Sequence, residues 1–109
     1  MKAFITIVGL NSYYGTAPFH EDQKLTLIKE PENRYDKEAI RAELPGLGLV
    51  GYVANSTYTV KGECMSAGRL YDKIGDRASA RVCYILANAL VCRVKTHTES
   101  FEESASLAQ

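Results

Sequence analysis

Residues 78–94 read ASARVCYILANALVCRV, two runs rich in β-branched and aromatic residues that meet at Ala87 and Asn88. Runs of this composition favour β-strands, and the short break between them favours a hairpin. The first run is apolar on both faces, with Val82, Tyr84 and Leu86 on one and Cys83 and Ile85 on the other. Two apolar faces are expected where a sheet curls into a barrel. This stretch therefore predicts a mainly β fold in the form of a small barrel.

The remaining sequence adds four strand patterns and two short helical ones. Strands are predicted at residues 3–8, 24–30, 39–44 and 49–53, the last two joined as a hairpin across a Pro-Gly turn. A short helix is predicted from Asn55 or Ser56 to Lys61. A better signalled helix begins after a Ser66 cap and ends at Gly75. The count is about six strands and two short helices, a small β-barrel with helical insertions.

The chain of 109 residues allows one domain, predicted over residues 1–95 and followed by a mobile, polar and acidic tail over 96–109. No apolar run approaches the ~20 residues of a membrane span. The apolar start lacks a small-residue cleavage site, so we expect a strand there and a cytoplasmic protein. Three cysteines without a C-x-x-C pair and two isolated histidines predict no disulfide framework and no structural metal.

Charge is balanced overall but unevenly spread. The chain carries 13 basic and 13 acidic side chains, whereas residues 61–95 carry seven basic and three acidic ones, a local balance of +4. A neutral protein cannot hold nucleic acid by charge alone, because that affinity scales with the number of phosphates neutralised. A local basic groove can still hold a short strand. The charge pattern therefore argues against a protein that coats nucleic acid and permits one that binds a strand end.

The most unusual segment is KEPENRYDKEAI, residues 29–40, which places seven charges, an asparagine and a tyrosine between two predicted strands. Asn33 and Asp36 are also the residue types that cap turns in an ordinary solvated loop. Tyr35 beside Asp36 favours a functional role, because the pair offers a ring face to a base and a carboxylate to a hydroxyl. A carboxylate repels phosphate, so it suits a ligand that presents a hydroxyl instead, as a strand end does.

This segment, preceded by Val8-Gly9-Leu10 and followed by Val50-Gly51-Tyr52-Val53, resembles the HIRAN domain. The resemblance spans about residues 3–95 and rests on the motif E-P-x-N-x-Y-D-x-x-A-I with Gly-Tyr downstream. It implies an OB-like β-barrel that captures the 3′-hydroxyl end of single-stranded DNA without catalysis. The family occurs at the front of some helicases and as a free-standing small protein in bacteria. It therefore implies a place in DNA repair or replication-fork processing, with a helicase or another repair protein as partner.

The resemblance also implies roles for individual residues. Tyr35 would contact the terminal nucleotide, Asp36 would accept a hydrogen bond from the 3′-hydroxyl, and Asn33 would shape the loop. The loop after the first strand would add the aromatic residues Tyr13 and Tyr14, although the arginine that the family carries there is missing. A basic rim must offset the carboxylate, and its candidates are Lys37, Lys61, Arg69 and Lys73.

Two other hypotheses stay open. A protein-interaction or adaptor role on the same fold would be favoured by an exposed apolar patch near Tyr13, Tyr14 and Phe19, whereas a cleft joining Tyr35 to the basic helix would favour DNA. A small hydrolase or nuclease would need a metal held by a cluster of carboxylates, for which the candidates are Glu30, Glu32, Asp36 and Glu38. Their alternating spacing would splay them along an extended segment. We therefore expect no catalysis, no metal and no cofactor.

Overall fold

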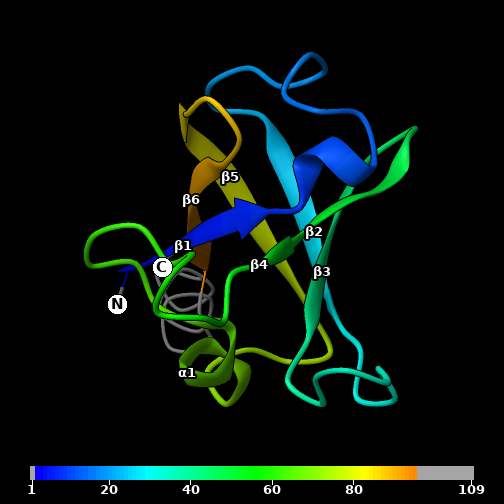
Figure 1. Ribbon diagram of the computed structural model, residues 1–109, viewed down its shortest axis with the longest axis vertical. Helices are drawn as coiled ribbons and strands as arrows, with labels where there is room; N and C mark the ends of the chain where they lie inside the picture. The colour runs from blue at the N-terminus through cyan, green and yellow to red at the C-terminus, as the bar shows by residue number, and fades with distance from the viewer. Residues whose placement is uncertain (1, 96–109) are drawn as a thin grey trace, which may run out of the picture.

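A closed barrel of six antiparallel strands makes up the computed structural model, which describes residues 2–95 (Figure 1). The strands are β1 (Lys2–Val8), β2 (Lys24–Lys29), β3 (Ile40–Leu44), β4 (Gly48–Val53), β5 (Arg77–Ile85) and β6 (Leu90–Lys95). Their order around the barrel is β1-β4-β3-β2-β5-β6. The predicted mainly β barrel is confirmed, and the predicted tail lies outside the described residues.

Alternation of inward and outward side chains along each strand builds the core. In β3, Ile40, Ala42 and Leu44 are buried while Arg41 and Glu43 between them face outward. The predicted hairpins are both present, β3 with β4 and β5 with β6. A β-bulge between Val82 and Tyr84 interrupts the second hairpin. Beyond this bulge the end of β5 turns its apolar side chains outward, so the two-sided apolar pattern of the sequence is only partly buried.

The barrel closes at β1, which pairs along most of its length with β6 but only at Ile7 and Val8 with β4. The rest of that edge is covered by the segment 54–65. The N–H of Ala54 donates to the carbonyl of Thr6 at 2.8 Å, and the N–H of Lys61 donates to the buried Thr6 hydroxyl at 3.0 Å. The N–H of Met65 donates to the Phe4 carbonyl at 2.7 Å. These bonds fix where the segment after β4 runs.

Gly51 lets β4 approach the end of β1 closely. A Cβ at this position would lie 2.7 Å from the Val8 carbonyl oxygen and 2.9 Å from Ile7 Cγ2. Any side chain there would displace the backbone of β1, because real Cβ contacts are not this short. The Gly-Tyr pair singled out in the sequence therefore combines a packing requirement at Gly51 with a half-buried ring at Tyr52.

The helical predictions are partly wrong. α1 (Ala67–Tyr71) has the predicted Ser66 cap, whose Oγ accepts a hydrogen bond from the Arg69 N–H at 3.3 Å, but the helix ends before Gly75. A short 3₁₀ helix, η1 (Leu10–Ser12), was not predicted. No described helix is long and apolar enough to cross a membrane.

The helix predicted from residue 55 or 56 to 61 is absent, and turns replace it. The Ser56 side chain accepts a hydrogen bond from the Tyr58 N–H at 3.1 Å, while its carbonyl accepts from the N–H of Thr59 and Val60. Serine competes in this way with helical hydrogen bonding, and β-branched residues lose side-chain freedom in a helix. The bond from Lys61 to Thr6 then holds the segment against β1 rather than letting it continue as a helix.

Candidate functional site

Asn33 organises the loop between β2 and β3. Its Oδ1 accepts hydrogen bonds from the N–H groups of Tyr35 at 2.9 Å and Asp36 at 3.0 Å, the pattern of an Asx turn. Its Nδ2 donates to Glu30 Oε1 at 2.9 Å. At the base of the loop the N–H of Glu30 donates to the Ala39 carbonyl at 2.8 Å. Hydrogen bonds therefore hold the loop at its centre and at its base. Tyr35 lies on the outside of this loop and is 93% exposed.

The carboxylate of Asp36 is held by two hydrogen bonds. Its Oδ1 accepts from the Glu38 N–H at 2.9 Å, and its Oδ2 accepts from Asn55 Nδ2 at 2.9 Å. Asn55 in turn accepts a hydrogen bond from the Gly68 N–H, in the first turn of α1, at 2.8 Å. An ionised carboxylate has about four acceptor sites, so two bonds leave Asp36 able to accept a further donor. Asn55 therefore joins the loop to α1 and orients the carboxylate.

A cleft of about 470 Å³, which we call the Asp36 cleft, opens between this loop and the segment after β4. Its apolar lining comes from Val8, Ala39, Tyr52, Val53 and Ala54. Its polar lining comes from Asn33, Tyr35, Asp36, Asn55, Ser56 and Thr59. A surface that combines apolar side chains with placed polar groups is typical of small-ligand sites.

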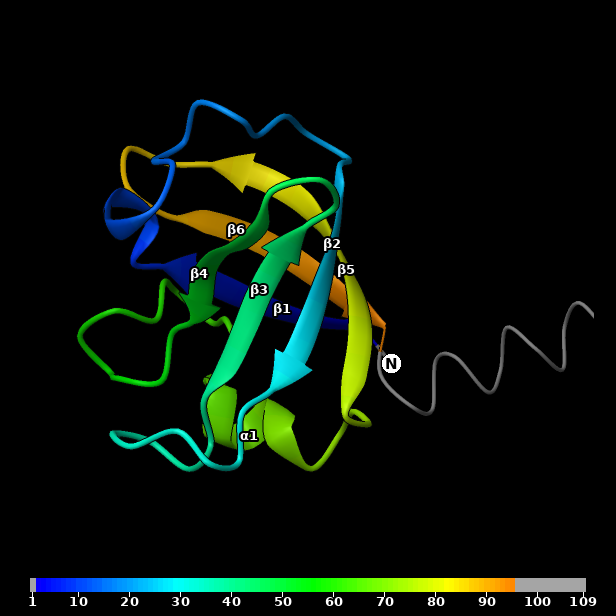
Figure 2. The same ribbon diagram turned by 90° about the vertical axis from the view of Figure 1, so that its right-hand side faces the viewer.

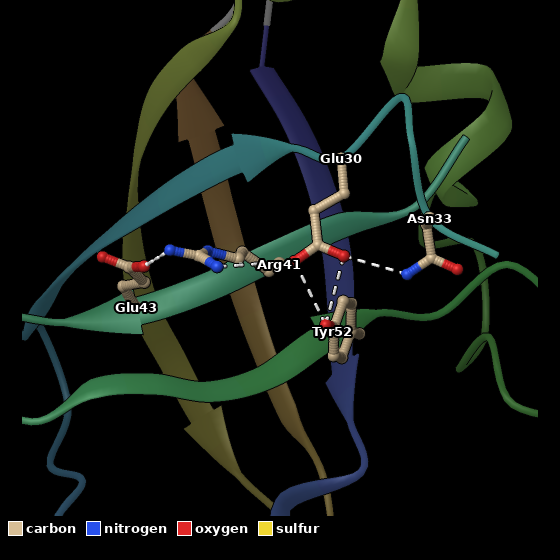
Figure 3. Close-up of polar contacts among 5 residues, drawn as sticks. All are labelled: Glu30, Asn33, Arg41, Glu43 and Tyr52. Carbon is tan, nitrogen blue, oxygen red and sulfur yellow. Dashed lines mark hydrogen bonds and ion pairs between the residues drawn. The ribbon is translucent and has the colours of Figure 1, made fainter. Parts of the chain in front are cut away.

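A polar network ties the loop to the barrel wall (Figure 3). The hydroxyl of Tyr52 lies 3.2 and 3.1 Å from the two oxygens of Glu30, and Arg41 Nη1 lies 3.7 Å from Glu30 Oε2. Arg41 also pairs with Glu43. Desolvation by burial, followed by the hydrogen bond to Glu30, raises the pKa of Tyr52 to about 12. Tyr52 therefore stays protonated at neutral pH and donates to Glu30, which also holds Asn33.

The structure brings some of the predicted site residues together and leaves others apart. Asn33, Tyr35 and Asp36 all line the Asp36 cleft. Tyr13 lies close enough to Tyr52 to contribute to the rise of its pKa. Neither Tyr13, which is 39% exposed, nor Tyr14, which is 49% exposed, lines the cleft.

The predicted basic rim is scattered. Lys61 lines a second cleft of about 330 Å³ together with Tyr58, and this cleft shares Val8 and Thr59 with the Asp36 cleft. The two clefts therefore adjoin. The other three predicted cations line neither: Lys37 and Arg69 are exposed, and Lys73 is half-buried.

Sequence reasoning missed two residues of the site. Asn55 orients Asp36, and Tyr58 presents a side chain that is 94% exposed beside Lys61. Both fall in the segment that was predicted as helix, and no local pattern indicates which side chains the loop 31–39 meets. The one available signal is position: Asn55 comes two residues after the end of β4, where the chain leaves the barrel wall.

The four carboxylates considered for a metal are not gathered. Glu30 faces Tyr52 and Arg41, whereas Asp36 faces Asn55. Within residues 2–95 no group of three or more His, Cys, Asp or Glu side chains is placed to hold a metal ion.

Comparison with known proteins decides the family. The HIRAN domain model matches residues 2–99. The chain belongs to the HIRAN domain family. Two solved structures share the HIRAN fold of this chain. One is the HIRAN domain of human HLTF, with a TM-score of 0.63 and 19% identity over 98% of this chain and 86% of that one. The other is a structural-genomics protein from Lactobacillus plantarum, with a TM-score of 0.56 and 17% identity over 86% of this chain and 95% of that one.

Identities this low show that the fold is shared, and no more. No curated relative matches the chain at a significant level. The family assignment confirms the resemblance that was identified from the motif at residues 30–40.

Proposed function

We propose that this HIRAN domain is a non-catalytic module that captures the 3′-hydroxyl end of single-stranded DNA in the Asp36 cleft. One observation carries the proposal: a carboxylate oriented by Asn55 and the Glu38 N–H lies at the rim of an apolar cleft, next to the almost fully exposed ring of Tyr35. A base with a terminal hydroxyl matches both groups. HIRAN domains bind DNA, and membership of the family supports a DNA partner.

The chemistry selects an end over the interior of a strand. The terminal base stacks on Tyr35, a contact worth about 1–3 kcal/mol. The 3′-hydroxyl donates to Asp36, a charge-assisted hydrogen bond. An internal nucleotide carries a phosphate at that position instead, and the carboxylate repels it. The adjoining cleft gives the rest of the strand a path past Tyr58, which offers a second ring, and Lys61, which offers a charge to a phosphate.

We also propose a place in DNA repair or replication-fork processing, beside a helicase or another repair protein, in the cytoplasm. The alternative of a protein-interaction module has less support. The apolar patch that it needs is only partly present, because Tyr13 and Tyr14 are exposed but Phe19 is buried. The cleft that was expected to join Tyr35 to the basic helix is not formed either, since Arg69 and Lys73 do not line the Asp36 cleft. Membership of the HIRAN domain family therefore carries the preference for DNA.

The test compares oligonucleotides that differ only at their 3′ ends. Fluorescence anisotropy is measured with a labelled single strand of about ten nucleotides, within the usual range of site sizes, carrying a 3′-hydroxyl or a 3′-phosphate, and with a blunt duplex. The hydroxyl strand is expected to bind tightest. Asp36→Asn keeps the shape of the side chain but removes its charge. It is expected to weaken binding about ten- to a hundredfold, since a hydrogen bond to a charged group contributes about 1.5–3 kcal/mol.

Glu32→Gln is the matched control. It removes one negative charge from the same loop at an exposed residue that does not line the Asp36 cleft. If Asp36 acts only as a charge, both variants would strengthen binding to the DNA polyanion. If it accepts the hydroxyl, Asp36→Asn alone weakens binding. Equal affinity of the wild-type protein for hydroxyl and phosphate ends would refute the proposal.

A further inference from the structure

The hydrogen bonds of Asp36 leave acceptor capacity on both of its carboxylate oxygens. Oδ1 accepts from the Glu38 N–H and Oδ2 accepts from Asn55 Nδ2, each at 2.9 Å. An ionised carboxylate has about four acceptor sites, two on each oxygen. Among residues 2–95 Asp36 forms no ion pair that would cover the remaining sites. Asp36 can therefore accept two further donors at once, one on each oxygen.

Asn55 places a hydrogen-bond donor beside these acceptors. Its side-chain amide carries two N–H groups, and one of them donates to Asp36 Oδ2. Its amide oxygen accepts from the Gly68 N–H at 2.8 Å, which fixes the end of the amide that faces Asp36. The second N–H of Nδ2 meets no acceptor in the described part of the chain. Asp36 and Asn55, which both line the Asp36 cleft, thus offer two acceptors and one donor to a ligand.

Contacts on two sides hold these groups in place. The β2–β3 loop and α1 lie at the same end of the barrel (Figures 1 and 2), and Asn55 bonds to both of them. On the loop side, the Asp36 N–H donates to Asn33 Oδ1 at 3.0 Å. A ligand therefore meets polar groups that are already arranged, and little side-chain freedom is lost when it binds.

A pair of neighbouring hydroxyls matches this arrangement better than a single one. The last sugar of a DNA strand has one free hydroxyl, at its 3′ carbon. The last sugar of a strand that ends in a ribonucleotide has two, at the 2′ and 3′ carbons and on the same face of the ring. Because each hydroxyl is both a donor and an acceptor, this diol can donate to both oxygens of Asp36 and accept from Asn55. A carboxylate that binds a ribose 2′-hydroxyl is a recurrent feature of dinucleotide sites.

We propose that the Asp36 cleft prefers a ribonucleotide at the 3′ end, and that it binds a terminal 2′,3′-diol more tightly than a terminal deoxyribose. The ligand class is a strand that ends in ribose, as an RNA with an unmodified 3′ end does. The 2′-hydroxyl is the group by which a protein distinguishes RNA from DNA. DNA ends still bind, through their single hydroxyl. This inference rests on the proposed capture of 3′ ends and names the sugar that the same site selects.

The probes for the test are four DNA strands of about ten nucleotides, labelled at the 5′ end, that differ only in the last sugar. That sugar is ribose, 2′-O-methylribose, deoxyribose or dideoxyribose. In fluorescence anisotropy the ribose end is expected to bind about tenfold more tightly than the deoxyribose end, the low end for a hydrogen bond to a charged group. The 2′-O-methyl end has no 2′ donor and is expected to bind no more tightly than deoxyribose. The dideoxyribose end, which has neither hydroxyl, is expected to bind less tightly than deoxyribose.

Two variants assign the preference to the carboxylate. Asp36→Asn replaces one carboxylate oxygen with an amide group that donates, so it is expected to remove the tenfold preference for ribose. Glu32→Gln is the matched control, because it makes the same change of charge at an exposed residue of the same loop that does not line the cleft. It is expected to keep the preference in full.

Equal affinity of the wild-type protein for ribose and deoxyribose ends would overturn the inference. A dideoxyribose end that binds less tightly than both would show, in the same titrations, that capture of the 3′-hydroxyl still holds. A deoxyribose end that binds no better than dideoxyribose would instead refute the proposed function. A preference for ribose that survives in Asp36→Asn would also overturn the inference, since another group would then bind the 2′-hydroxyl.

Discussion

Asn33→Ala removes the side chain that holds the candidate site in shape. Three hydrogen bonds are lost: two that Asn33 accepts from the backbone of Tyr35 and Asp36, and one that it donates to Glu30. A net hydrogen bond contributes about 0.5–1.5 kcal/mol, and the low end applies because water can reach the groups released in this surface loop. The free energy of unfolding is therefore expected to fall by about 1.5 kcal/mol. Urea denaturation measures this loss directly.

Binding is expected to weaken as well, because the loosened loop must be ordered again when DNA binds. Fixing the backbone of one residue costs about 1–2 kcal/mol, so re-forming the turn at Tyr35 and Asp36 predicts at least about a tenfold loss of affinity for the 3′-hydroxyl strand. Gln23→Ala is the control. Gln23 pins another loop by accepting from the His20 N–H and donating to the Pro18 carbonyl. It should lower stability but leave DNA affinity unchanged. An Asn33→Ala protein that binds DNA like the wild type would refute the reasoning.

Two further perturbations test the barrel that carries the site. Gly51→Ala places a Cβ 2.7 Å from the Val8 carbonyl oxygen and should cost about 1–3 kcal/mol of stability; an unchanged midpoint of thermal unfolding would show that β1 and β4 can separate without cost. The pKa of Tyr52 is raised from 10.0 to about 12, so its protonated form is favoured in the folded state and the stability that it contributes is lost as pH rises from 10 towards 12. Urea titrations across this range should therefore show the wild-type protein losing stability more steeply than Tyr52→Phe, and parallel losses would show that folding does not raise the pKa of Tyr52.

Local sequence carried enough information to predict the strands and the shape of the loop. Alternation of Ile40, Ala42 and Leu44 with charged neighbours fixes which face of β3 is buried. The turn at residues 33–36 is equally local, because Asn33 bonds to backbone groups two and three residues away. Patterns of this kind depend on nothing outside the segment that contains them.

The rest of the site depends on barrel closure, which local patterns do not encode. Glu30 meets Tyr52, and Asp36 meets Asn55, only because β4 and the segment after it lie beside the β2–β3 loop. The failed helix prediction at 55–61 has the same origin, since the hydrogen bond from Lys61 to Thr6 is a long-range contact. The basic residues show most clearly that local patterns do not predict which side chains lie together in the fold. The local balance of +4 in residues 61–95 suggested one rim. The fold instead places Lys61 beside the Asp36 cleft, and Arg81 and Arg93 on another wall of the barrel.

The most direct test of the central claim is to locate the strand end on the protein. Amide spectra of the ¹⁵N-labelled protein are recorded as a short 3′-hydroxyl single strand is added. We predict shifts concentrated at the Asp36 cleft, in residues 33–38 and 55–59, and at Gly68, whose N–H bonds to Asn55. Shifts confined to the outer faces of β2, β5 and β6, with the signals of Tyr35 and Asp36 unmoved, would contradict the claim that this cleft captures DNA ends.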